Sequence, residues 1–276
     1  MKGEKIMFKL GILFGDGVEI PEIAEGYEFY EIPCGIQMDP MQSDYIWRQK
    51  KAEIQEVCNL PVTVCSHFLH GYGLRVCGPR ADWKQLEFWT PRALERCAEI
   101  GVKVAGVYGS FFPLEDEKDR PQMEDETFRF LRMLDKYAQD NGILIALEPM
   151  ARLKTVFPRY LDGLRIANAA GGKNIKVMAD LNYFLELDQP LENIKTESEK
   201  CLHVHIQGDG GSQPHVGNRE VIFTRLFTIL KEIGYEGGVS CACPWVATKE
   251  GEIDRKYETG ATIEYLKKIR SKVYDG

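Results

Sequence analysis

Short apolar segments alternate with longer amphipathic segments along this 276-residue chain, and this alternation is the feature that most restricts its fold. Short apolar runs bounded by turn residues are typical of buried strands, whereas the stretches between them have the length of helices. A repeated strand–helix order requires parallel strands joined by crossover helices. The pattern therefore predicts an α/β fold.

About eight strands are expected from these runs. They are Phe8 to Phe14, Tyr27 to Ile32, Val62 to His67, Val102 to Tyr108, Ile143 to Glu148, Ile175 to Asp180, Leu202 to Ile206 and Gly238 to Cys243. The expected helices include Asp44 to Cys58, Asp125 to Asn141, Tyr160 to Ala170, Arg219 to Ile233 and Tyr257 to Val273. Since (β/α)8 barrels of roughly 250 residues are common, we expect residues 1–276 to form one TIM-barrel domain. No GxGxxG sequence follows the first strand, so a nucleotide-binding open sheet has no support.

Composition excludes several classes of partner. The formal charge of -7 and the lack of a Lys and Arg cluster argue against nucleic acid. No uninterrupted apolar span reaches about 18 residues, so no membrane partner is expected, and the N-terminus has no signal-peptide pattern. The eight cysteines form no CxxC pair, which favours a reducing, cytoplasmic location.

Three potential metal ligands each lie at the C-terminal end of an expected strand. Glu148 closes the run ILIALE, Asp180 closes IKVMAD, and His205 lies in CLHVHI. Because parallel barrel strands all end at the same face, these side chains should converge at the barrel mouth. The sequence therefore predicts a divalent metal site there.

The same elements resemble the sugar phosphate isomerase/epimerase family, the xylose isomerase-like TIM barrels. The resemblance rests on EP after the fifth strand, Asp after the sixth, HxH in the seventh and GYEGGVS before the eighth, and it covers nearly the whole chain. It implies a barrel that holds Mn2+, or a similar ion, on Glu, Asp, His and a second Glu. By that resemblance Glu148, Asp180 and His205 are the metal ligands.

The chain departs from the family pattern at several positions. Ala242 lies where the eighth strand of the family carries its glutamate, and Cys241 and Cys243 flank it. Tyr183 replaces a substrate-side histidine, and Lys154 occupies a position that is often acidic in ketose epimerases. In those epimerases two metal-bound glutamates exchange the carbon-bound proton. With one glutamate, the expected chemistry is a one-base isomerisation or elimination, with Glu148 as base and Lys154 or Tyr183 as proton donor.

Each ligand assignment has a structural alternative. Glu148 could instead form an ion pair with Arg152 or Lys154, and Asp180 could cap the following helix. His203 has the same strand parity as His205 and is expected to orient a ligand. The two cysteines could simply pack, but a thiolate from Cys241 or Cys243 would favour Zn2+ over Mn2+.

The loops at the same face supply candidates for substrate binding. His67 and His70 follow the third strand, and Tyr108 ends the fourth, where its hydroxyl could bind sugar hydroxyls, as could Glu31. Arg152 matches a common family arginine. Arg219, at the start of a helix, could bind an anion.

We therefore expect a metal-dependent isomerase, epimerase or lyase that acts on a small-molecule sugar, polyol or sugar acid by removing a proton next to a carbonyl. The alternative is a barrel that binds carbohydrate without catalysis or serves as a subunit of a larger complex, as the loss of the second glutamate suggests. A homo-oligomer is compatible with the family, and the aromatic segment from Trp83 to Trp89 could contribute to its contacts or to ordinary packing.

Overall fold

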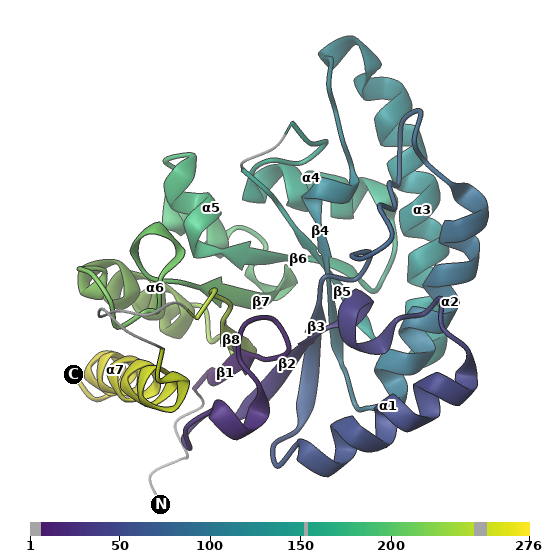
Figure 1. The fold of residues 1–276 in the computed structure, drawn as a ribbon. Coiled ribbons are helices and arrows are strands. Elements are labelled where there is room, and N and C mark those ends of the chain that lie inside the picture. The colour runs from purple at the N-terminus through teal and green to yellow at the C-terminus, as the bar shows by residue number, and fades with distance from the viewer. Residues whose placement is uncertain (1–6, 152–153, 246–252) are drawn as a thin grey trace, which may run out of the picture.

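Eight parallel strands close into a barrel, which confirms the expected fold. The computed structural model describes residues 7–151, 154–245 and 253–276. The strands follow one another around the barrel in sequence order, and β8 pairs with β1 (Figure 1). They are β1 (Lys9–Leu13), β2 (Phe29–Pro33), β3 (Val62–Ser66), β4 (Val104–Tyr108), β5 (Leu144–Glu148), β6 (Ile175–Asp180), β7 (Cys201–Ile206) and β8 (Gly238–Cys241).

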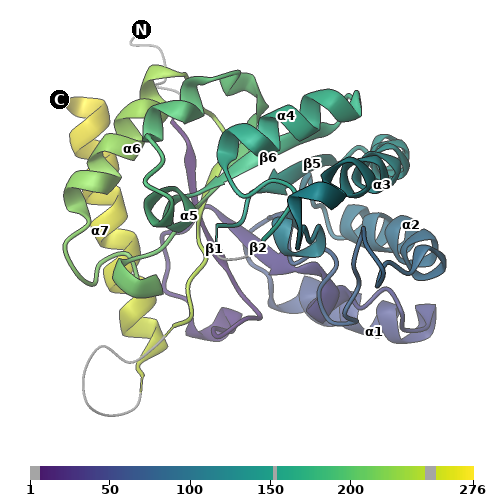
Figure 2. The same ribbon diagram turned by 90° about the horizontal axis from the view of Figure 1, so that it is seen from above.

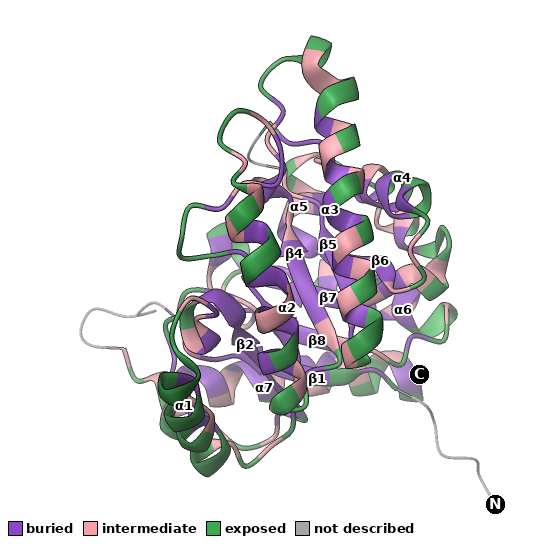
Figure 3. Cartoon of the chain, turned by 90° about the vertical axis from the view of Figure 1, so that its right-hand side faces the viewer, coloured by how far each residue is buried: buried purple, intermediate pink, exposed green. Residues whose placement is uncertain are grey.

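The helices form an outer ring around the strands (Figure 2). They are α1 (Asp44–Val57), α2 (Trp83–Glu99), α3 (Arg120–Asn141), α4 (Tyr160–Ala170), α5 (Leu181–Glu186), α6 (Glu220–Glu232) and α7 (Arg255–Asp275). Short helical turns lie in the loops: η1 (Ile20–Glu22), η2 (Cys34–Met38), η3 (Gly109–Phe111), η4 (Glu117–Asp119), η5 (Leu191–Lys195), η6 (Ser198–Lys200) and η7 (Asp209–Gly211). Buried side chains concentrate on the strands and on the helix faces that cover them, whereas the outer helix faces are exposed (Figure 3).

Two helices lie outside the set expected from sequence. The first, α2, contains Pro91 and several aromatic residues, both poor signals of a helix, yet it buries a stripe at helical spacing that includes Leu86, Trp89 and Ala93. Trp89 is fully buried and its indole N–H donates to the Phe68 carbonyl, so packing accounts for this part of the aromatic segment. The second, α5, is only six residues long and begins directly after β6.

The barrel interior is filled below its mouth. Phe29 points inward from β2, and its ring occupies space left by Gly11 on β1 and Gly238 on β8. A Cβ added at Gly11 would lie 2.2 Å from the Phe29 ring, and one at Gly238 would lie 2.6 Å from it. The Phe29 and His203 rings meet edge to face with centroids 6.1 Å apart. These contacts close the barrel under the site. Among the described residues, no helix is both long and apolar enough to cross a membrane.

Gly11→Ala is expected to destabilise the protein by about 1–3 kcal/mol, because the new methyl group overlaps the Phe29 ring in a tightly packed interior. Urea unfolding at constant pH measures the change. The matched control is Gly260→Ala in α7, where the added Cβ meets Ala24 at 3.4 Å and the lost glycine flexibility should stabilise by a few tenths to about 1 kcal/mol. Equal stabilities of Gly11→Ala and wild type would contradict this account of the interior.

Candidate active site

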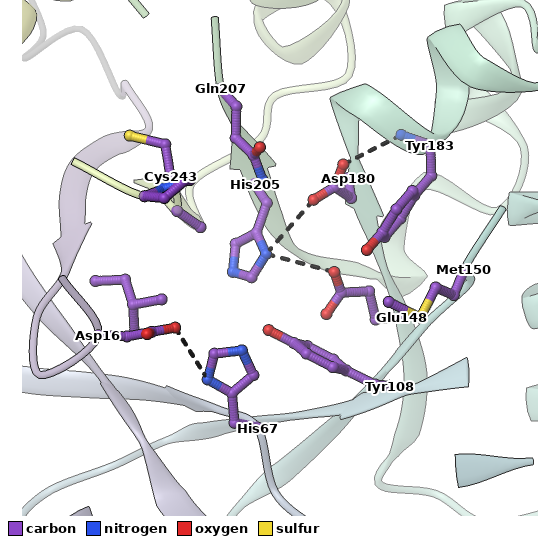
Figure 4. A pocket seen from close by; sticks show the side chains of 13 residues that line it. Asp16, His67, Tyr108, Glu148, Met150, Asp180, Tyr183, His205, Gln207 and Cys243 are labelled. Atoms are coloured by element: carbon purple, nitrogen blue, oxygen red, sulfur yellow. Dashed lines mark hydrogen bonds and ion pairs between the residues drawn. The ribbon is translucent and has the colours of Figure 1, made fainter. Parts of the chain in front are cut away.

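The carboxyl ends of the strands surround a cavity of about 270 Å3. Figure 4 shows its walls, with Glu148, Asp180 and Tyr183 on one side and Asp16 on the other. The lining residues are Leu13, Asp16, His67, Tyr108, Glu148, Met150, Asp180, Tyr183, His205, Gln207, Ala242, Cys243 and Pro244. The cavity thus lies at the face where active sites of TIM-barrel enzymes are found.

Glu148, Asp180 and His205 come together in one wall of this cavity. His205 Nδ1 lies 3.5 Å from Glu148 Oε1 and 3.8 Å from Asp180 Oδ2. All three side chains are almost completely buried. Ligand atoms about 2.1 Å from one tetrahedral ion would be about 3.4 Å apart, so these separations fit a shared cation.

Asp180 has two separate roles, one for each carboxylate oxygen. Its Oδ1 accepts hydrogen bonds from the backbone N–H groups of Asn182 and Tyr183 and so caps α5. Its Oδ2 faces His205. The helix cap and the ligand position therefore coexist.

Glu31, which ends up beneath these ligands, joins the two histidines of β7. Its carboxylate is fully buried, with Oε2 2.8 Å from His203 Nε2 and Oε1 2.9 Å from His205 Nε2. A proton on His205 Nε2 would be held by Glu31, which leaves the Nδ1 lone pair directed at Glu148 and Asp180. A carboxylate that fixes the tautomer of a ligating histidine in this way is a common feature of metal sites.

The buried charges perturb one another strongly. Burial alone would lower the pKa of His205, but Glu31 and Glu148 hold it well above its usual value. Burial and the neighbouring Glu148 raise the pKa of Asp180 to about 7, and burial also raises the pKa of Glu148. Glu31 is the exception, because the two imidazoles overcome its burial and hold its pKa well below the usual range.

The residues present fit a divalent cation. Besides the three converging ligands, Glu148 Oε2 is buried and has no hydrogen-bond partner among the described residues. A buried carboxylate oxygen without a donor is costly, and a cation would relieve that cost as well as the repulsion between Glu148 and Asp180. Without a cation, protonation of one of these two carboxylates would relieve the repulsion instead.

A second group of polar side chains lines the cavity from the loop after β1 and from the ends of β3 and β4. His67 Nδ1 lies 3.9 Å from Asp16 Oδ2, and the His67 ring meets the Tyr108 ring edge to face at 4.7 Å. Burial lowers the pKa of His67 to about 4. His67 also has a positive φ of 53°, a backbone conformation that is strained for most residues and tends to occur at functional sites.

The other residues singled out from sequence are dispersed. Ala242 and Cys243 line the cavity, whereas Cys241 is buried in the core near Tyr27. Lys154 is exposed, and its Nζ lies 3.4 Å from the Glu115 carbonyl. His70 is also exposed, with its ring 5.5 Å from the His67 ring.

The two candidate arginines are placed differently. The Arg219 side chain donates to Asp209, Asn182 and the Gln207 carbonyl and does not line the cavity. Arg152 lies outside the described residues.

Two functional candidates come mainly from the structure. Asp16 lies in the loop after β1 and was not selected from sequence, although it follows the expected strand Phe8 to Phe14 by two residues, a position at the carboxyl-end face of the barrel. Glu31 was expected only to bind substrate hydroxyls. Its position as the one carboxylate in the buried strand FYEIP is a signal for a paired charge.

Comparison with known proteins identifies the family. Residues 23–269 match the family described as "Xylose isomerase-like TIM barrel", and the chain belongs to it. A relative from Methanocaldococcus jannaschii, "Uncharacterized protein MJ1311", is 26% identical over 176 residues. That match covers 60% of this chain and 59% of the relative, so the aligned region spans less than two thirds of the relative's length.

Solved structures share the fold across nearly the whole chain. D-Psicose 3-epimerase from Clostridium cellulolyticum H10, solved with D-tagatose, has a TM-score of 0.76 and 19% identity, with 95% of this chain and 99% of that chain covered. The IolI protein solved with a bound zinc atom has a TM-score of 0.69 and 17% identity, with coverage of 98% and 100%. Sugar epimerases are thus among the structural neighbours of this chain.

Glu31→Gln is expected to weaken the binding of Mn2+ or Zn2+ by about 10- to 100-fold, because an amide cannot accept protons from both histidines and so no longer fixes the tautomer of His205. Isothermal titration calorimetry on chelator-treated protein measures the affinity. Glu258→Gln is the matched control, since Glu258 is a buried glutamate 3.1 Å from His215 and lies outside the cavity. Unchanged affinity in Glu31→Gln would refute the orienting role.

Asp180→Asn is expected to stabilise the metal-free protein at pH 8 but not at pH 3. The folded-state pKa of Asp180, about 7, lies above the unfolded value of about 3.9. Ionised Asp180 therefore costs stability increasingly as the pH rises from about 4 to about 7 and costs nothing when both states are protonated. The gain should be at most a few kcal/mol, since one pKa unit corresponds to about 1.4 kcal/mol.

Urea unfolding in the presence of a chelator, at several pH values, measures this difference. The asparagine keeps an oxygen that can cap α5, so loss of the cap should not mask the effect. If Asp180→Asn is less stable than wild type at pH 8, the ionised Asp180 carboxylate does not destabilise the folded protein.

Proposed function

We propose that this protein is a metal-dependent isomerase or epimerase, or a lyase of the same type, that acts on a sugar, polyol or sugar acid. The observation that carries the proposal is the cluster of Glu148, Asp180 and His205 in the cavity wall, where the buried Glu148 Oε2 has no hydrogen-bond partner within the part of the chain that the structure describes. Membership of the xylose isomerase-like family and the sugar epimerases among its structural neighbours support the same class.

Glu148, Asp180 and His205 would hold the ion. When bound, a divalent cation there would polarise the substrate carbonyl and make the adjacent C–H more acidic. The zinc in the IolI structure and the thiol of Cys243 at the cavity edge support Zn2+, whereas the oxygen-rich ligand set also suits Mn2+. We do not extend the ligand set to Cys241, which packs in the core.

Glu148 is the proposed base. Burial raises its pKa, which makes the carboxylate a stronger base. Its Oε1 faces His205, and its Oε2 has no hydrogen-bond partner among the described residues. A one-base isomerisation or elimination needs only this carboxylate and no second glutamate across the substrate.

The second proton-transfer group would come from Tyr183 or from the Asp16–His67 pair. Tyr183 lines the cavity beside Asp180, on the same side as Glu148, and suits transfer of a proton to a substrate oxygen. Asp16 lies across the cavity from Glu148 and next to His67, which suits transfer at the opposite face of the substrate and thus inversion at carbon. Lys154, the other donor considered from sequence, is exposed and does not line the cavity.

Glu148→Gln is expected to lower the exchange of a substrate C–H with solvent deuterium by about 10²- to 10⁴-fold, the range usual for loss of a general base. The test is NMR-detected exchange with Mn2+- or Zn2+-loaded protein on a panel of ketoses, keto-sugars and keto-inositols. Glu258→Gln, with the same chemical change outside the cavity, is the control.

A second candidate function is carbohydrate binding without catalysis. The observation in its favour is that Ala242 lines the cavity where the family resemblance places a glutamate. Saturable binding of a panel sugar with no exchange by wild type would favour this candidate, and exchange that depends on Glu148 would exclude it.

Asp16→Asn and Tyr183→Phe are expected to separate the two kinds of chemistry. If the reaction inverts carbon, Asp16→Asn should lower product formation by about 10²-fold or more while exchange at Glu148 continues. If the reaction is instead an isomerisation that shifts the carbonyl group and uses Glu148 as the single base, Tyr183→Phe should lower kcat strongly and Asp16→Asn should lower it only slightly. If both variants react at the wild-type rate, neither Asp16 nor Tyr183 takes part in the mechanism.

A further inference from the structure

Four sulfur atoms meet in the core between β2, β3 and α2, away from the cavity. They belong to Cys34 and Met38 of η2, Cys65 of β3 and Cys97 of α2. The three cysteines are fully buried, and Met38 is 1% exposed. No residue of this group lines the cavity of the candidate active site.

The sulfur separations are those of a metal-thiolate site. Cys97 Sγ lies 3.4 Å from Cys65 Sγ, 4.0 Å from Cys34 Sγ and 3.7 Å from Met38 Sδ. The three thiol sulfurs all lie within 4.8 Å of one another. A tetrahedral ion with bonds of about 2.3 Å to sulfur places its ligands about 3.8 Å apart, so only small shifts are needed to enclose one.

A buried cation next to the sulfurs offsets part of the charge that such a site carries. Arg96 is 2% exposed and donates to the carbonyl oxygens of Met38, Asp39 and Gln42, which holds it against the η2 segment. Three thiolates and a divalent ion have a net charge of about −1, and Arg96, which also pairs with the exposed Asp44 at 3.3 Å, supplies positive charge on the protein side of the site. Arg96 also favours ionised sulfur. Although burial acts in the other direction, hydrogen bonds from Cys65 and Cys97 and the charge of Arg96 lower the pKa of Cys34 to about 5.

We propose that Cys34, Cys65 and Cys97, with Met38 as a weaker fourth ligand, form a structural site for a thiophilic divalent ion, Zn2+ foremost. Soft thiolate and thioether donors select such ions over Mn2+ or Mg2+. Thiols that become ligands release their protons to solvent when the ion binds. The ion ties the ends of β2 and β3 to α2. This proposal does not depend on the activity proposed above.

The test uses the full chain with Asp180→Ala and His205→Ala introduced together, so that the cavity cannot hold the ion. Because the sulfurs are buried, the protein is unfolded under reducing, oxygen-free conditions and refolded with Cd2+, a spectroscopic substitute for Zn2+. We expect about one Cd2+ per chain, a thiolate-to-metal charge-transfer band in the ultraviolet and a higher melting temperature with the ion than without it.

Cys97→Ser should lose the band and the stabilisation by Cd2+, whereas Cys77→Ser should keep both. Cys77 is a matched control because it is also buried, and its sulfur contacts the Pro113 carbonyl rather than the cluster. Circular dichroism shows whether each variant folds. Cadmium NMR on the protein with all its cysteines adds a measurement that needs no cysteine variant, and its chemical shift should report three thiolate ligands.

The proposal is overturned if refolding with Cd2+ gives no charge-transfer band, or if the band persists in a folded Cys97→Ser variant. It is also overturned if protein purified without oxygen contains a Cys65–Cys97 disulfide in place of an ion, which mass spectrometry would detect as the loss of two hydrogens. A cadmium shift typical of oxygen ligands would contradict it as well.

Discussion

Three carboxylates and two imidazoles lie almost entirely out of water at the mouth of this barrel, and the need to compensate their charges governs the arrangement of the site. Glu31 resolves part of the problem, because it takes one contact from each histidine of β7 and stays ionised. The remaining charges on Glu148 and Asp180 repel each other, and both carboxylates face His205. Two neighbouring carboxylates with raised pKa values have an unmet demand for positive charge, and this is the physical basis for expecting a cation.

The parallel topology explains why the barrel and three residues of the candidate site could be predicted from the sequence. The expected strands locate the eight observed ones to within a few residues, and the strand ends point to Glu148, Asp180 and His205 from sequence alone. One constraint, that all strands end at the same face, converts positions far apart in sequence into neighbours. His203 and His205 likewise share a side of β7 because of the two-residue period of a strand.

Loop conformations and contacts between side chains far apart in the sequence were harder to predict. The position of Asp16 depends on how the segment after β1 folds, and the exposure of Lys154 depends on the loop after β5, which no periodic pattern determines. The role of Glu31 requires knowing that β2 and β7 meet across the barrel interior, a contact between residues 172 positions apart. The convergence of Cys34, Cys65 and Cys97 is of the same kind, since scattered cysteines give no spacing signal until the strands and α2 are assembled.

The Phe29 ring, which packs against Gly11 and Gly238, affects how a small molecule could reach and leave the cavity. Among the described residues, the interior beneath Glu31 and His203 is filled, so the cavity lies on the side of the loops that follow the strands. A small molecule would therefore both enter and leave on that side. The loops there would influence binding and release together.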